Sequence, residues 1–471
     1  MSDRPRLNCK RWPARRESWA EDVAQLPNSG LLGSYLTPGT CNGRLTRYSL
    51  PSCAPAHQNR AMSGAQVTPA TGFLFTDEIL RDPYPTYRRF LVDDQIFHSV
   101  PYGGGGWAVF RHAACSSLIR DSRLSARRVG ASFLALPPER RAEFGELARM
   151  LSLWLLFIDA PEHSRLRKLM NKGFSRVVVD DLRPQIEAIV DRMLETMRHT
   201  SNVDVVRDVA YPLPVRVMAE MFGVQEALHE RFIRWTNAVA MFLGNPNRTV
   251  EQTQRAQEAV LALKEFFRGA VEERRRQKGS DLISLLLDIE EDGEVLTEEE
   301  LYAQCVMLLG AGHDTTRNLI GNGMYALLRH PKEMAELEKN PEIIRSAVEE
   351  LLRYESPIQF AGRVAKEEME ICGVLLRQGQ SIVFILGAAN RDPQQFKDPD
   401  HLDLNRLPNP HLAFGAGEHF CIGNQLARLE GQIAILRMVE RFPRMRLATQ
   451  SPEWAPNHGF RGLKALPVTL W

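Results

Sequence analysis

The stretch His411-Leu-Ala-Phe-Gly-Ala-Gly-Glu-His-Phe-Cys421-Ile-Gly-Asn-Gln-Leu-Ala-Arg-Leu-Glu430 decides what kind of fold and site this chain can build. Gly415 and Gly417 allow backbone conformations that other residues avoid, so a tight turn is expected before Cys421. The helical pattern that follows brings its N-terminal amide groups close to the sulfur and favours the thiolate that a soft metal binds. Gly423 leaves space for a flat group beside the backbone. The stretch predicts an exposed thiolate that binds iron.

A zinc site is the alternative interpretation of Cys421. His419 and Cys421 lie too close together for the usual zinc ligand pair, and no second pair with structural-site spacing occurs in the sequence. The seven cysteines are odd in number and scattered, which indicates a reducing compartment. A lone cysteine is also commonly a small buried apolar residue, so the assignment depends on the rest of the chain.

Composition bounds the class of protein. The 471 residues are 44% hydrophobic and 25% charged, which is ordinary for a globular chain. Residues 1–72 hold nine Lys and Arg against four Asp and Glu, which leaves 50 against 54 for the rest, without the dense basic face of a nucleic-acid-binding protein. The longest apolar stretch, Met150–Ile158, is too short to cross a bilayer. We expect a soluble, cytoplasmic monomer that binds neither nucleic acid nor membrane.

No linker rich in Pro, Gly or Ser interrupts the sequence after residue 72, so residues 73–471 are predicted to form one large domain. Residues 1–72 are interpreted as an N-terminal extension. They lack the apolar core of a signal peptide, and they are either disordered or the product of an upstream start codon, with the true start nearer Met62.

The periodicity predicts a mainly α-helical domain with small β-sheets. Helical spacing of apolar residues runs through 84–91, 180–197, 212–222, 252–276, 297–329, 342–354 and 422–441, and short strands are expected at 96–100, 107–110, 370–375 and 381–386. The four glycines of 103–106 lie between two strands and predict a hairpin turn. The segment Thr297–Arg329 predicts a central helix about 50 Å long, with a Thr297–Glu300 capping box at its start.

In the middle of that helix lies Gly310-Ala-Gly-His-Asp-Thr-Thr316. Each interior glycine costs about 1 kcal/mol relative to alanine and needs a reason. One interpretation is local loosening that admits a small ligand, with Asp314 and Thr315 relaying protons to it. The other is helix packing, in which the glycines allow a neighbour to approach and the threonines bond back to the helix. The motif alone does not choose between them.

The pattern Phe414-Gly-x-Gly-x-His-x-Cys421-x-Gly423 resembles the haem-ligand signature of the cytochrome P450 superfamily, and the match is closest to its soluble bacterial type. Ala311-Gly-x-Asp-Thr315 resembles the family's oxygen-activation motif. This resemblance covers residues 73–471, and it implies a cytochrome P450-like single large domain with a long central helix.

Further matches follow the family's order. Glu350-x-x-Arg353 resembles its structural ion pair, with Arg406 as third partner. Pro161 to Arg167 is similar to the segment with which bacterial members hold a haem propionate, and His163 and Arg167 share one helical face there. Arg363 and His419 resemble the remaining propionate contacts. A surface salt bridge is the alternative for each match taken alone.

The resemblance implies a b-type haem (iron protoporphyrin IX) whose iron is bound by Cys421. The cofactor-binding residues it implies are His163, Arg167, Ala311, Arg363, Phe414, Gly415, His419, Cys421 and Gly423. Asp314 and Thr315 are the expected catalytic residues, which deliver protons. The activity implied is insertion of one oxygen atom from O2 into an organic substrate, by C–H hydroxylation or a related oxidation, typical of secondary metabolism.

Electrons are expected from a separate ferredoxin and ferredoxin reductase, because the sequence has no flavin domain and no iron–sulfur cysteine spacing. Arg165, Lys168 and Lys172 are candidates for docking an acidic partner. An apolar substrate pocket is expected from the family's variable segments, which correspond here to 126–150, 225–250, Ile358–Ala361 and Phe460 and include Met241, Phe242, Leu243 and Phe360. Two alternatives stay open: a peroxide-dependent or rearranging haem-thiolate enzyme, and a haem-binding sensor.

Overall fold

The computed structural model describes residues 70–72, 74–93, 96–99, 106–133, 136–199, 202–246, 248–289 and 293–471. The predicted N-terminal extension lies outside the described residues, apart from Ala70–Gly72, which form strand β1. The turn expected at the glycine run also lies outside them, except for Gly106, which opens strand β3.

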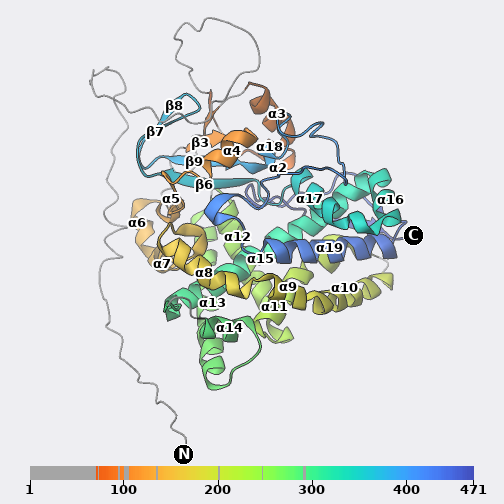
Figure 1. Ribbon diagram of the computed structural model, residues 1–471, viewed down its shortest axis with the longest axis horizontal. Coiled ribbons are helices and arrows are strands. Elements are labelled where there is room, and N and C mark those ends of the chain that lie inside the picture. Colours follow the sequence, from red (N-terminus) through yellow and green to blue (C-terminus); the bar gives the residue numbers. More distant parts are fainter. Residues whose placement is uncertain are drawn as a thin grey trace, which may run out of the picture. The chain divides into compact units, whose positions relative to one another are not determined.

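Helices make up the larger part of the described chain, and most of them lie on one side of the main sheet (Figure 1). They are α2 (Asp77–Arg81), α3 (Tyr84–Asp93), α4 (His112–Leu118), α5 (Val129–Phe133), α6 (Pro138–Arg141), α7 (Gly145–Ser152), α8 (Glu162–Gly173), α9 (Arg176–Asp181), α10 (Arg183–Arg198), α11 (Pro212–Phe222), α12 (His229–Gly244), α13 (Val250–Arg276), α14 (Leu282–Asp288), α15 (Glu298–Arg329), α16 (Pro331–Lys339), α17 (Ile344–Tyr354), α18 (Leu386–Ala389) and α19 (Asn424–Arg441).

Helix α15 is the long central helix that the sequence predicts. Thr297 is its N-cap, and the reciprocal hydrogen bonds between Thr297 and Glu300 form the expected capping box. The helix has 32 residues and is buried around most of its circumference, as expected of a helix that passes through a core. It packs against α11, α12, α13, α17 and α19. One side of this helix can therefore face a central cavity while the other sides are held by neighbours.

The main sheet has six strands in the order β1-β2-β3-β9-β6-β4. The strands are β1 (Ala70–Gly72), β2 (Phe97–Ser99), β3 (Gly106–Val109), β4 (Leu124–Ser125), β6 (Phe360–Ala365) and β9 (Ser381–Ile385). Strands β2 and β3 pair antiparallel, as a hairpin requires, and β9 pairs parallel with β3 and antiparallel with β6. A second sheet joins β10 (Arg446–Leu447), β11 (Pro467–Thr469) and β5 (Val203–Asp204).

The single strand expected at 370–375 is wrong in detail. The chain forms two short strands there, β7 (Met369–Ile371) and β8 (Val374–Leu376), paired antiparallel. Cys372 and Gly373 have φ of +45° and +80° and make the turn between them. The apolar residues on either side of the turn form one run in the sequence because the turn is only two residues long.

The predicted fold class, mainly helical with small sheets, is confirmed.

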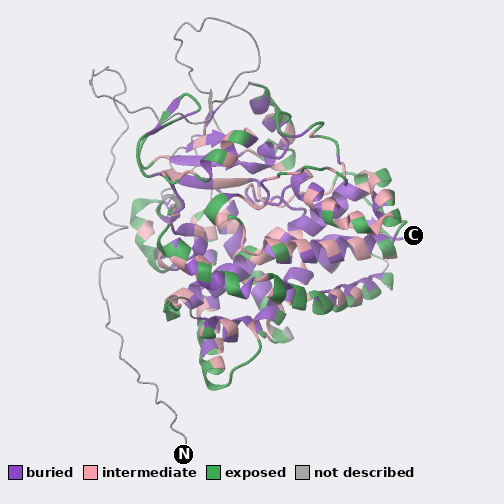
Figure 2. Cartoon of the chain, in the orientation of Figure 1, coloured by how far each residue is buried: buried purple, intermediate pink, exposed green. Residues whose placement is uncertain are grey.

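Buried side chains line the facing surfaces of the helices and the sheet, and exposed ones lie on the outside (Figure 2). The largest apolar cluster joins residues from Val129 in α5 to Leu470, and two smaller clusters lie against the main sheet. None of the described helices is long and apolar enough to cross a membrane.

A buried ion-pair network fixes the segment that leads to Cys421. Arg353 donates two hydrogen bonds of 2.7 Å to the carboxylate of Glu350, and neither side chain is exposed. The Nε of Arg406 lies 3.1 Å from both carboxylate oxygens. Arg353 also donates to three backbone carbonyl groups between residues 390 and 401, at 2.8–3.2 Å. The three residues expected to form one network therefore do so, and they tie α17 to the loop before the cysteine.

Candidate functional site

The loop before Cys421 is a tight turn held by backbone hydrogen bonds. Gly415 and Gly417 both have φ of +70°, in the left-handed region that favours glycine. The amide of Cys421 donates to the carbonyl of Phe414 at 3.0 Å. The side-chain amide of Asn424, the first residue of α19, donates to the Cys421 carbonyl at 2.7 Å. The turn presents Cys421 to a cavity of about 2330 Å³, counted with its opening to solvent.

The protonation of Cys421 depends on opposing effects. Burial raises the pKa of the thiol, while the hydrogen bond from the Gly423 backbone and the charges of Arg167 and Arg428 act to lower it. The sequence-based expectation that nearby amides favour the thiolate is correct in direction, but burial is the larger effect. A bound cation would reverse the balance, since a coordinating thiol is deprotonated outright.

The surroundings of Cys421 do not form a zinc site. Among the described residues, no group of three or more His, Cys, Asp and Glu side chains could hold a metal ion. Cys421 therefore supplies a single protein ligand at this place, and a metal bound to it needs its other ligands from a group that the protein does not provide. This arrangement fits a metal carried inside a larger cofactor.

A cluster of positive and imidazole side chains lines one side of the same cavity. It comprises Arg128, His163, Arg167, Arg363 and His419, here called the cationic cradle. The rings of His163 and His419 lie 4.1 Å apart between centroids. Burial and the charges of Arg363, His163, Arg128 and Arg167 lower the pKa of His419 to about 2. The cradle therefore concentrates positive charge that an anion would stabilise.

The Nε2 atom of His163 is buried, and no other described residue accepts or donates a hydrogen bond to it. Burial, followed by the charge of Arg167, lowers the pKa of His163. A buried polar atom without a partner is unfavourable by about 1–3 kcal/mol. A carboxylate placed between His163 and Arg167 would remove that cost. The two propionates of a haem are carboxylates of this kind.

The rest of the cavity fits the flat, apolar body of a haem. A Cβ built on Gly423 would meet nothing within 4 Å, so the backbone is open to a group lying close to it. Of the residues that the sequence assigned to the cofactor and its reaction, the cavity brings together His163, Arg167, Ala311, Thr315, Arg363, Phe414, Gly415, His419, Cys421 and Gly423. Asp314 is not among the lining residues.

Helix α15 crosses the cavity without a break. It is α-helical throughout 310–316, so the local loosening that one of the two interpretations required does not occur. The packing interpretation accounts for the glycines, because a Cβ on Gly310 would lie 3.3 Å from Val239 and one on Gly312 would lie 3.4 Å from Met218. Thr315 donates from Oγ1 to the carbonyl of Ala311 at 2.9 Å, the back-bonding that this interpretation expects.

Asp314 lies on a different side of α15 from Thr315. Its carboxylate accepts a hydrogen bond of 3.1 Å from Arg317, and the pair is largely buried. Arg317 also donates to the Leu463 carbonyl at 3.0 Å and lies 4.8 Å from the ring centroid of Tyr211. The acid and the alcohol are adjacent in sequence, but only the alcohol reaches the cavity.

The apolar wall of the cavity comes partly from the expected segments. Phe242, Leu243, Ile358, Phe360, Ala361 and Phe460 line the cavity. Met241 does not, because it points to a different side of α12 from Phe242, and its sulfur lies 3.9 Å from the Asn457 side-chain nitrogen. From the segment 126–150 only Arg128 contributes, and Leu155, Leu156 and Phe157 occupy that side. The 3₁₀ turn at Leu155–Phe157 directs these residues inward.

Two backbone segments of this wall meet at a pair of glycines. The amide of Gly459 donates to the Gly244 carbonyl at 2.8 Å, and a Cβ on Gly459 would lie 2.8 Å from the Gly244 Cα. Asn457 adds a hydrogen bond of 3.1 Å to the Ala240 carbonyl. The end of α12 and the C-terminal loop therefore form one continuous surface.

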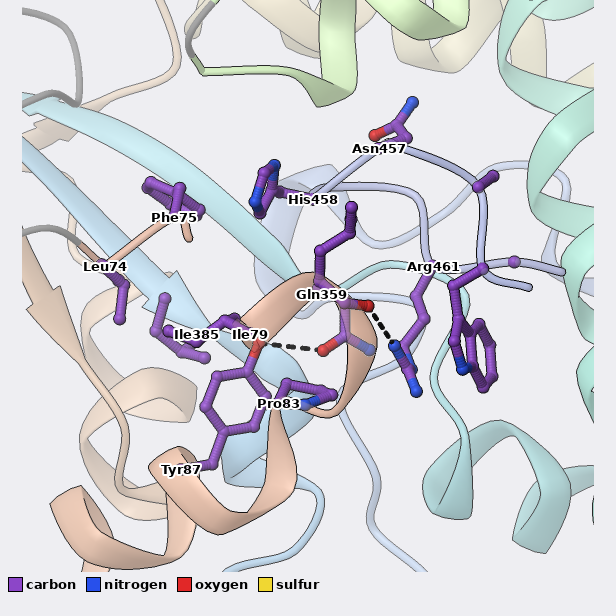
Figure 3. A pocket seen from close by; sticks show the side chains of 14 residues that line it. Leu74, Phe75, Ile79, Pro83, Tyr87, Gln359, Ile385, Asn457, His458 and Arg461 are labelled. Carbon is purple, nitrogen blue, oxygen red and sulfur yellow. Dashed lines mark hydrogen bonds between the residues drawn. The ribbon is translucent and has the colours of Figure 1, made fainter. Parts of the chain in front are cut away.

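A second, smaller cavity of about 390 Å³ lies near the start of the described chain (Figure 3). Tyr87 donates to Gln359 at 3.0 Å across it, and Arg461 donates to the Leu80 carbonyl at 3.0 Å. The two cavities share no lining residue. The first contact joins α3 to the segment before β6, the second joins α2 to the C-terminal loop, and both serve the fold.

The sequence did not single out Arg128, Arg248 or Glu430, which also line the large cavity. Arg128 follows β4 in a segment without a motif, and it reaches the cradle only through the fold. Burial raises the pKa of Glu430 well above its ordinary value. The one feature of the sequence that could have indicated a place for Glu430 in the cavity is its position nine residues after Cys421, on the helix that follows.

Comparisons with known proteins agree with this site. Residues 148–464 match the family model described as cytochrome P450. The chain is 37% identical over 395 residues to the biotin biosynthesis cytochrome P450 of Bacillus subtilis, covering 84% of this chain and 98% of that one. It is 38% identical to the cytochrome P450 monooxygenase PikC of Streptomyces venezuelae, covering 82% and 91%. A crystal structure of a myxobacterial cytochrome P450 in complex with myristic acid superposes with a TM-score of 0.76 at 36% identity, covering 84% and 98%.

Proposed function

Since the chain belongs to the cytochrome P450 superfamily and is a monooxygenase with a b-type haem, we propose that it inserts one oxygen atom from O2 into an apolar small molecule, with the residues of the large cavity in the roles given below. The observation that carries this proposal is the position of Cys421 beside the cationic cradle, in a cavity that α15 also lines, with no group of three or more potential metal ligands among the described residues.

Cys421 would bind the haem iron, and the cradle would hold the propionates. When bound, the haem iron activates dioxygen, and the thiolate ligand favours O–O cleavage by donating electron density. His163, Arg167, Arg363 and His419 carry the donors for two carboxylates, and Arg128 adds a charge that the motif does not include. Phe414, Gly415, Gly423 and Ala311 would lie against the haem ring, and the two glycines have no side chain that would block it.

The hydroxyl of Thr315 would be the group that donates a proton directly to bound dioxygen. This hydroxyl faces the cavity and now donates to the Ala311 carbonyl, so a rotation about χ1 would turn the O–H toward a bound molecule. Asp314 would take up protons on the side of α15 away from the cavity and pass them to Thr315. Because the carboxylate is held by Arg317 away from the cavity, this transfer needs a side-chain rotation or a bridging water.

The placement of Asp314 also favours a second candidate, a haem-thiolate enzyme that uses peroxide or rearranges its substrate without delivered protons. Product formation with a surrogate ferredoxin system, compared with peroxide alone, separates the two. A haem-binding sensor would form product with neither.

We propose an apolar substrate drawn from secondary metabolism, with the molecule itself unspecified. Its body would lie against Phe242, Leu308, Ile358 and Phe460, which line the cavity. The relative solved with myristic acid is consistent with a long carbon chain as one substrate type.

We propose a ferredoxin and its reductase as the electron source. Lys168 and Lys172 are exposed four residues apart on α8, the helix that carries His163 and Arg167, and they would meet an acidic partner. Arg165 is a poor candidate because it is half-buried and paired with Glu300. A cytoplasmic monomer remains our expectation, and gel filtration of the haem-loaded protein checks the oligomeric state.

The spectrum of the reduced protein under carbon monoxide tests the assignment of the site. A strongly red-shifted Soret band is expected for thiolate ligation, and Cys421→Ser should abolish it while His419→Ala should retain it with weaker haem binding. Protein that purifies without haem absorption despite haem supply would contradict the proposal.

A further inference from the structure

One cation of the large cavity lies outside the cationic cradle. Arg248 belongs to the short segment between α12 and α13, and it lines the cavity together with Phe242, Leu243 and Pro246. The cradle side chains come from different elements: α8, β6, the Cys421 loop and the segment after β4. The haem propionates account for the cradle, but they give no reason for an arginine on the apolar wall.

Arg248 is held in a defined orientation. Its Nε donates to the Asn245 carbonyl at 3.1 Å, and its guanidinium carbon lies 4.5 Å from the ring centroid of Phe242. The guanidinium is half-buried. A planar cation stacked on an aromatic ring keeps its donor fork in one plane, which reduces the freedom it loses when it binds a ligand.

The segment that carries Arg248 is fixed at both ends. Thr249 caps α13, and its capping box uses the side chain of Gln252. Asn245 donates to the same Gln252 side chain at 3.3 Å. Gly244, at the end of α12, is bonded to Gly459. These hydrogen bonds hold the backbone on both sides of Arg248 in place, so the position of Arg248 in the cavity wall is defined.

The charges around the cavity leave a role for an anionic ligand. Glu430 is the one acidic side chain among the described residues that line it. Burial raises the pKa of Glu430 well above its ordinary value, which disfavours the charged form of this group. The cavity that Arg248 and Thr315 share is also lined by apolar side chains such as Met307, Leu308 and Phe360.

We infer that Arg248 binds the carboxylate of a substrate whose apolar body extends from this arginine toward Ala311 and Thr315. A guanidinium fork pairs with a carboxylate through two parallel hydrogen bonds. The carboxylate would be bound at the end of the molecule remote from the oxidised carbon. This inference rests on the proposed function, and it names the substrate class of the same site: acyl chains or similar apolar bodies with a free carboxylate.

The test measures binding to the haem-loaded protein by isothermal titration calorimetry and by the substrate-induced change of the Soret band. The probes are straight-chain carboxylic acids from octanoate to hexadecanoate and the methyl ester of each. The wild-type protein should bind the best acid about tenfold more tightly than its ester. This factor corresponds to the lower end of the stabilisation that a hydrogen bond to a charged group provides, as expected for an arginine that is only half-buried. Arg248→Gln should abolish this preference and leave the dissociation constant of the ester unchanged.

Two further variants sharpen the result. Arg255→Gln removes a positive charge from the exposed side of α13, where Arg255 pairs with Glu251, and should keep the wild-type preference. Arg248→Lys keeps the positive charge but loses the two parallel donors of the guanidinium, so it should retain only part of the preference for acid over ester. An unchanged ester affinity in Arg248→Gln shows that the cavity is intact.

Equal binding of acid and ester by the wild type, or a preference that survives Arg248→Gln, overturns the inference. So does a protein with a normal carbon monoxide band that binds no acid in the series. None of these results affects the proposed function, which fails separately if the red-shifted band is absent.

Discussion

Replacing Glu350 by Gln is expected to destabilise the protein strongly. The carboxylate of Glu350 is the shared acceptor for Arg353 and Arg406, and Arg353 has no exposed surface. The substitution leaves a fully buried guanidinium facing an amide, which can accept with only one atom. Removing one partner of a buried ion pair costs about 3–5 kcal/mol, a large part of the 5–15 kcal/mol that typically stabilises a folded domain.

The measurement is the free energy of unfolding of the haem-loaded protein in urea, followed by far-UV circular dichroism. The chain provides a matched control in Glu265 and Arg268, which have the same spacing and a similar contact, with Nε of Arg268 2.9 Å from Glu265. That pair is exposed on α13, so Glu265→Gln should leave the unfolding curve unchanged, as is usual for surface pairs.

A double variant tests the cause. In Glu350→Gln/Arg353→Met the unpaired buried charge of Arg353 is gone, so the loss should be smaller than the sum of the two single losses by about 1–3 kcal/mol. The reasoning is refuted if Glu350→Gln costs no more than Glu265→Gln, or if the two single effects simply add.

Three other outcomes are expected. Thr315→Val removes the hydroxyl but keeps the shape of the side chain, so product formation should fall about 100-fold with an unchanged dissociation constant for substrate; an equal loss of binding would assign Thr315 to packing. His163→Ala should speed the transfer of haem to apomyoglobin, while Lys168→Ala on the exposed side of α8 should leave it unchanged; equal transfer rates would remove His163 from the cradle. Glu430→Gln should change how stability depends on pH: burial raises the pKa of Glu430 in the folded state, so wild-type stability falls as pH rises above the unfolded pKa of about 4.5. The variant should match the wild type below that pH and exceed it in free energy of unfolding at pH 7, and parallel pH curves would contradict the assignment.

Much of the fold and the site could be predicted because the informative residues are close together in sequence. The turn at Gly415 and Gly417, the cap at Thr297 and the pair Glu350–Arg353 depend on local backbone and helix geometry, which a sequence states directly. The long central helix follows from its cap and from the helical spacing of apolar residues through 297–329.

The missed features depend on residues that are distant in sequence. Nothing beside Arg165 indicates that it will pair with Glu300, 135 positions away, and this pairing lowers its value as a docking residue. Arg128 likewise joins the cradle only when the chain has folded. The direction of Asp314 could not be predicted either, because Arg317 and the Leu463 carbonyl decide it.

The contact between Gly244 and Gly459 has a consequence for how substrate preference can change. The end of α12 and the C-terminal loop are 215 positions apart, yet their backbones touch where neither glycine has room for a Cβ. A segment transplanted from another family member to replace residues 240–248 alone would meet an unaltered C-terminal loop, and any side chain at position 244 would separate the two. New specificity at this wall should therefore require exchange of both segments together, and related enzymes should differ here in matched pairs of changes.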